Sequence, residues 1–209
     1  RNTLYFNKTS TVFGLNYTYQ ENASKVLLTN GFDTRLHTFH EGQLRWNISK
    51  YYNIRINSTL GRKSSASDYA AGRDFYIEYF NVRPIFSYQP NTTFRIALNG
   101  KYSEKENNSD LAEKAVIRDV GLDLRYNQIK KGSLTGRFNF ILIDYNASTN
   151  SAIAFEMLEG LQTGNNFTWG LTYQRKIAKN LQLNFNYNGR KSEDNNAIHS
   201  GGMELRAFF

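Results

Sequence analysis

The sequence predicts an all-β protein, a transmembrane antiparallel up-and-down β-barrel of about ten strands. Three observations predict it: apolar and polar residues alternate, short and long connections alternate, and the last alternating segment ends in an aromatic residue. In residues 181–188, for example, Leu, Leu, Phe and Tyr alternate with Gln and three Asn. Successive side chains of a strand point to opposite faces, so this pattern indicates strands with one apolar and one polar face.

Counting the alternating segments gives ten strands, with residues 1–10 as a periplasmic lead-in and 11–209 as one outer-membrane barrel domain. Gly42 could divide the second strand, and Pro84, which cannot donate a ladder hydrogen bond, suggests a bulge in the fourth. The predicted strands are 11–20, 32–48, 54–62, 74–88, 93–104, 115–127, 133–145, 165–175, 181–191 and 200–209.

The connections between these strands alternate in length. Those near Ser49, Gln89, Asn127 and Lys176 are short. The others are longer and polar: 21–31, 63–73, 104–114, 146–164 and 192–199. Short periplasmic turns that alternate with longer extracellular loops are typical of transmembrane barrels.

The C-terminal segment has an apolar row that ends the chain. Its members are Met203, Leu205, Ala207 and Phe209. A last strand of this kind resembles the signal that the bacterial barrel-assembly machinery recognises in its clients. We therefore expect that machinery to be a partner during biogenesis.

The composition favours a membrane barrel over a soluble one. Aromatic residues make up 15% of the chain, with 14 Tyr and 15 Phe, although the mean hydropathy is −0.60. The longest apolar run, Phe140–Ile143, is far below the roughly 18 residues of a membrane-spanning helix. Aromatic side chains in the apolar row, such as Trp46 and Tyr126, suit the lipid headgroup level. We expect this row to contact outer-membrane lipids.

The polar row should then face the lumen. In so narrow a barrel, inward charges are expected to pair and to plug most of the lumen. A basic lumen that attracts anions is the alternative. The formal net charge of the chain is +8. The basic residues are scattered along the strands, which argues against a nucleic-acid partner. The predicted lumen-facing network comprises Arg45, Arg55, Glu78, Arg95, Asp119, Asp123, Arg125, Arg137, Glu204 and Arg206.

The candidates for chemistry are few. Cysteine is absent and only three histidines occur. His37 and His40 lie three positions apart, so on one strand they point to opposite faces. His199 is interpreted as a rim or capping residue, and Asp119 and Asp123 as ion-pair partners of nearby arginines. We predict no catalytic residue, no metal and no cofactor.

The segment at 151–164, SAIAFEMLEGLQTG, is more apolar than an exposed loop usually is. It is interpreted as a strand extension, or as a segment that folds over the barrel mouth or docks a partner.

The chain also resembles a known family. Residues 156–192 (EMLEGLQTGNNFTWGLTYQRKIAKNLQLNFNYNGRKS) and 199–209 (HSGGMELRAFF) look like the C-terminal β-barrel of large outer-membrane proteins of the Bacteroidota. The resemblance extends through 72–90 (GRDFYIEYFNVRPIFSYQP) and 124–134 (LRYNQIKKGSL). It implies a Gram-negative outer membrane and a barrel that anchors a larger polypeptide. The start at Arg1, without a signal peptide, agrees with a processed protein or a piece of a longer one.

These observations together predict a non-enzymatic barrel in the cell outer membrane. It would act as a membrane anchor or structural subunit of a larger protein or complex, and its partners would include outer-membrane or periplasmic subunits. A small pore for anionic or polar solutes is the first alternative. An enzyme at the barrel rim that acts on lipid A or peptides is the second.

Overall fold

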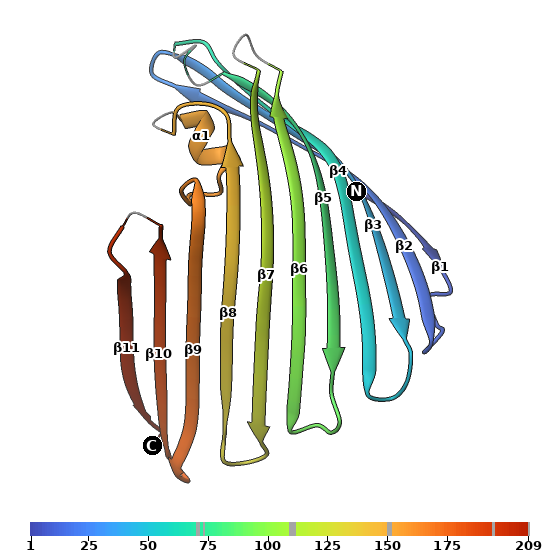
Figure 1. The fold of residues 1–209 in the computed structure, drawn as a ribbon, viewed down its shortest axis with the longest axis vertical. Coiled ribbons are helices and arrows are strands. Elements are labelled where there is room, and N and C mark those ends of the chain that lie inside the picture. The colour runs from blue at the N-terminus through green and yellow to red at the C-terminus, as the bar shows by residue number, and fades with distance from the viewer. Residues whose placement is uncertain (70–71, 73, 109–111, 150–151, 194, 209) are drawn as a thin grey trace.

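The computed structural model describes residues 1–69, 72, 74–108, 112–149, 152–193 and 195–208. They form one antiparallel sheet and one short helix (Figure 1). The strands are β1 (Asn2–Phe6), β2 (Phe13–Leu28), β3 (Gly31–Asn47), β4 (Tyr52–Ser67), β5 (Phe75–Tyr88), β6 (Phe94–Asn107), β7 (Glu113–Gln128), β8 (Gly132–Tyr145), β9 (Gly164–Ala178), β10 (Leu181–Ser192) and β11 (Ile198–Ala207), and the helix is α1 (Ala152–Met157).

Each strand pairs with the next one in the chain, in the order β1 to β11. This confirms the predicted all-β, up-and-down antiparallel fold class. All ten predicted strands are present, as β2 to β11. The segment predicted as a lead-in contains an additional strand, β1, which pairs with β2 from Asn2↔Tyr19 to Phe6↔Leu15. The described sheet, which would form the wall of a barrel, therefore has eleven strands.

Two details differ from the sequence prediction. Pro84 does not produce a bulge: the register of β5 with β6 is the same at Val82↔Tyr102 and at Ile85↔Asn99, and only the pairs between them are missing. Because proline has no N–H, the ladder is interrupted there without an extra residue. The first predicted long loop is mostly strand, since β2 continues to Leu28 and β3 begins at Gly31.

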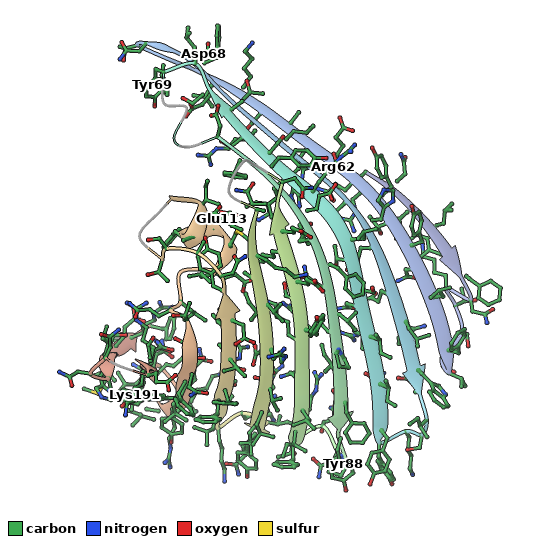
Figure 2. The ribbon with its side chains drawn as sticks, turned by 45° about the horizontal axis from the view of Figure 1, so that its top comes forward. Arg62, Asp68, Tyr69, Tyr88, Glu113 and Lys191 are labelled. Atoms are coloured by element: carbon green, nitrogen blue, oxygen red, sulfur yellow. The ribbon has the colours of Figure 1, made fainter. Side chains whose placement is uncertain are left out.

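The sheet is strongly curved, so its two faces differ (Figure 2). The helix α1 and the residues after it contact side chains from β4 to β8, which is possible only on the inside of the curve. Side chains of the concave face converge and are more buried, such as Ala97, Ser103 and Ile117. Their neighbours in sequence point outward and are less buried.

The convex face carries a continuous band of apolar side chains, here called the apolar belt. Leu98, Leu122 and Phe138 lie directly opposite one another on β6, β7 and β8 and are 52%, 43% and 46% exposed. The same row extends across eight strands through Phe13, Trp46, Ile54, Phe86, Leu98, Leu122, Phe138 and Trp169. An exposed apolar surface of this extent is typical of a surface that interacts with a membrane or another protein.

Charged side chains bound the apolar belt at the α1 end. Arg118 Nη1 donates to Asp144 Oδ2 at 2.7 Å, and Lys114 pairs with Glu104. At the opposite end, aromatic side chains such as Trp46, Tyr88 and Tyr126 lie near the short turns. Figure 2 shows Tyr88 at the short-turn end and Asp68 at the other.

In the described part of the chain, no helix has the length and apolar character needed to span a bilayer.

Candidate functional site

The connection between β8 and β9 folds back onto the concave face. Its helix, α1, buries Ile153, Ala154 and Met157, and Leu158 follows directly; Met157 is 0% exposed. These four side chains pack in one cluster against Ile77, Ala115, Ile117, Ile141 and Ile143 of β5, β7 and β8. Residues 151–164 were interpreted as a strand extension or as a segment that folds over the barrel mouth or docks a partner. The structure shows a segment that folds over the concave side of the sheet (Figure 1).

Local sequence explains the short helix. Ala, Glu, Met and Leu favour helix, and residues 153, 154, 157 and 158 share one helical face. Phe155 lies on the opposite face and is 70% exposed. The helix ends at two left-handed residues, Glu159 with φ 57° and Gly160 with φ 73°, and the Gly160 N–H donates to Phe155 O at 3.1 Å.

Two carboxylates tie this loop to lysines of the wall. Lys63 Nζ lies 2.5 Å from Glu156 Oε1. Lys101 and Lys105, both on β6, lie 2.6 and 3.0 Å from Glu159 and are 10% and 11% exposed. Lys105 also donates to Met157 O at 2.9 Å. The loop is therefore held by an apolar cluster and by three ion pairs around it.

Glu156 and Glu159 were not among the residues predicted from the sequence. The available signal was two acidic residues beside an apolar stretch, together with Lys101 on a predicted strand and Lys105 just beyond its predicted end. Without the curvature of the sheet, the sequence does not show that these groups meet.

The ion pairs make the docking of the loop dependent on pH. Burial alone raises the pKa of Glu159, but Lys105 and Lys101 outweigh it and lower the pKa to about 2. The hydrogen bond from Lys63 lowers the pKa of Glu156. A carboxylate whose pKa is lowered in the docked state stabilises that state at pH values above its ordinary pKa of 4.5. This stabilisation is lost as the pH falls towards 2.

We therefore expect the loop to remain docked from neutral pH down to about pH 4.5 and to loosen progressively below it. The measurement is hydrogen exchange of the Leu158 and Gly160 amides, expressed as protection factors so that the intrinsic effect of pH cancels. Glu159→Gln is the control: its protection should already be lower at neutral pH and should change less on acidification. Protection that is equal in both proteins at every pH would contradict this role of Glu159.

The predicted lumen-facing network lies on the concave face with one exception. Arg45 is opposite Arg55, Arg95 is opposite Arg125, and Asp123 is opposite Arg137. Register also places Asp119, Glu204 and Arg206 on this face. Glu78 is the correction: it alternates with buried Ile77 and Tyr79, so it points outward with Tyr76 and Phe80, and it accepts a hydrogen bond from Asn108 at 3.1 Å.

Only part of this network is paired as expected. Arg137 Nε lies 2.9 Å from Asp123 Oδ1, as predicted, and Asn99 donates to the other oxygen at 2.6 Å. Glu204 and Arg206 pair along their own strand at 2.8 Å. Asp119 lies opposite Lys101, whose amine turns to Glu159 instead.

The three histidines lie apart from one another. His37 is on the concave face, where Nε2 lies 2.7 Å from Tyr79 Oη. His40 is on the convex face, with Nδ1 2.6 Å from Tyr17 Oη. His199 stacks on Tyr187, 6.0 Å between ring centroids, and lies 2.8 Å from its hydroxyl. Within the described residues, no cluster of three or more His, Asp or Glu side chains suited to a metal ion is present.

The C-terminal apolar row lies on the outer edge strand. Met203, Leu205 and Ala207 are opposite Phe185, Leu183 and Leu181 of β10. Met203 is 75% exposed. Phe209, the last member of the predicted assembly signal, is outside the described residues.

Comparison with known proteins finds a distant structural similarity. No protein-family model and no curated protein matches the chain. Among solved structures, LpxR from Salmonella typhimurium is similar over 99% of this chain and 88% of its own, with a TM-score of 0.38 and 10% identity. A similarity at this level does not extend to activity.

Proposed function

We propose that this chain is a wall section of an outer-membrane β-barrel that serves as membrane anchor and structural subunit of a larger protein or complex. The apolar belt carries this proposal. Its side chains lie on the convex face of β2 to β9, whereas the concave face is mainly polar outside the apolar cluster under α1. A strand wall with an apolar outside and a polar inside is the arrangement that a bilayer requires.

The two edges of the wall support the structural role. Because successive strands are antiparallel and eleven are described, β1 and β11 run in the same direction. Figure 1 shows these two strands at opposite sides of the curved sheet. An all-antiparallel barrel needs an even number of strands, and unpaired edges are not tolerated in lipid. Further strands, from the same polypeptide or from another subunit, would complete the wall.

The concave face supports a structural rather than an enzymatic role. The loop that contains α1 occupies the concave side at the long-loop end, and its carboxylates are engaged by Lys63, Lys101 and Lys105. His37 and His40 diverge to opposite faces, so the two cannot act on one substrate atom. We therefore assign no catalytic residue.

A disulfide test distinguishes a wall section from a barrel that closes on itself. The chain has no cysteine, so introduced pairs report cleanly. With Thr3→Cys on β1 and Ser200→Cys on β11, we expect no intramolecular disulfide after oxidation in the membrane. The control pair, Thr3→Cys with Thr18→Cys, should form one, because these hydroxyls already lie 3.1 Å apart. Efficient intramolecular bonding of the β1–β11 pair would contradict the proposal.

A further inference from the structure

The concave face carries two kinds of cationic side chains. Towards the α1 end, Lys63, Lys101 and Lys105 lie 2.5 to 3.0 Å from carboxylates of the loop. In the middle, Arg137 lies 2.9 Å from Asp123. These cations are neutralised by the protein itself.

The arginines nearer the short-turn end are arranged differently. Arg45 on β3 lies directly opposite Arg55 on β4, and Arg95 on β6 directly opposite Arg125 on β7. None of the four forms an ion pair with a carboxylate of the described residues. Like charges opposite each other in a sheet are destabilising. Two such pairs on one face therefore destabilise the sheet unless an anion neutralises them.

Three of these arginines, Arg45, Arg55 and Arg95, line a cavity. Its volume is about 690 Å³, and its walls include Arg45, Arg55, Arg95, Asn53 and Ser87. No Asp or Glu occurs among the described residues that line it. The cavity has room for a small anionic group and presents cations and neutral donors to it.

Two of the guanidinium groups are held in place by neutral partners. Arg45 Nη2 donates to Ser10 O at 2.6 Å, and Arg95 Nη2 donates to Ser87 Oγ at 3.0 Å. Each guanidinium has five N–H donors, so these bonds orient the group and leave donors for a ligand. All three lining arginines are partly buried, which reduces solvent screening of their charge.

We propose that Arg45, Arg55 and Arg95 form a binding site for a phosphate group, with Arg125 adding to its positive potential. Guanidinium forks match the oxygens of phosphate and form short charge-assisted hydrogen bonds with them. Bound phosphate also removes the repulsion between the opposed arginines. The phosphate belongs to a free phosphorylated solute or to a lipid headgroup, since both present the same chemistry.

The test is calorimetric titration of the detergent-solubilised chain with inorganic phosphate at constant ionic strength, sodium chloride serving as the balancing salt. We expect saturable binding that Arg55→Gln or Arg95→Gln weakens at least about ten-fold. Arg137→Gln is the matched control: it removes the same charge from the same face, but its arginine already has a carboxylate partner. This control should bind phosphate as the original chain does.

A second arm identifies the source of the phosphate group. Phosphatidylglycerol in phosphatidylcholine vesicles replaces inorganic phosphate as the probe. Arginine-dependent binding of phosphatidylglycerol alone supports the site and identifies a lipid headgroup as its ligand, whereas binding of inorganic phosphate supports a free solute. Absence of saturable binding to both probes, or equal weakening by Arg137→Gln and Arg55→Gln, overturns the proposal.

Discussion

Replacing Leu122 by arginine is expected to destabilise the membrane-inserted protein by about 2–4 kcal/mol, the cost of a cationic side chain on the lipid face near the bilayer midplane. Leu122 lies on the convex face between Leu98 and Phe138, in the middle of the apolar belt, and is 43% exposed. In water, the same exposed leucine would accept arginine with a change within about 0.5 kcal/mol. The sign and size of the change in unfolding free energy therefore show whether lipid or water surrounds this face. The measurement is urea unfolding of the protein in phospholipid vesicles.

Leu27→Arg provides the matched control. Leu27 is also an apolar residue on a strand and is 70% exposed, but it lies at the tip of the β2–β3 hairpin, beyond the charged end of the belt. We expect its replacement to leave the free energy of unfolding nearly unchanged. If both substitutions changed the free energy of unfolding equally, the surroundings of the belt would be no more apolar than those of the hairpin tip.

Replacing Met157 by alanine is expected to lower the stability of loop docking by about 2–5 kcal/mol, because a buried side chain is removed from a packed cluster. Met157 is 0% exposed and packs with Ile77, Ile117 and Ile143. The Leu158 N–H donates to Ala154 O at 2.8 Å, so its exchange reports opening of the helix. This amide should exchange about 30-fold faster or more in Met157→Ala.

Phe155→Ala removes a larger side chain from the same helix and serves as the control. Phe155 points away from the wall and is 70% exposed. Its replacement should change the exchange of the Leu158 amide little, as expected for an exposed position. If instead Phe155→Ala accelerated exchange more than Met157→Ala, the loop would dock through its other face.

The strands and their faces could be predicted because apolar and polar residues alternate in the sequence with a period of two. In β10, Leu181 to Asn188 alternate without exception, and the structure keeps the four apolar residues on one face. The same alternation places nine of the ten predicted network residues on the concave face. Glu78 was assigned to the wrong face because charged residues also occur on the outer face where the belt ends.

The remaining elements lack such a periodic signal. β1 has five residues, too few for alternation to stand out from chance. Helix α1 has six, fewer than two turns, so its 3.6-residue period is not visible either. The contacts of Glu159 with Lys101 and Lys105 join residues more than fifty positions apart. They depend on how the sheet curves, which a single sequence does not specify.

Tryptophan fluorescence tests most directly whether the convex face contacts lipid. The only two tryptophans, Trp46 and Trp169, both lie in the apolar belt. In vesicles of phosphatidylcholine brominated on its acyl chains, we expect strong quenching of their emission and little quenching by aqueous iodide. Two results together would contradict lipid contact. One is quenching by iodide without quenching by the brominated lipid, and the other is a protein that is folded and monodisperse in buffer without detergent.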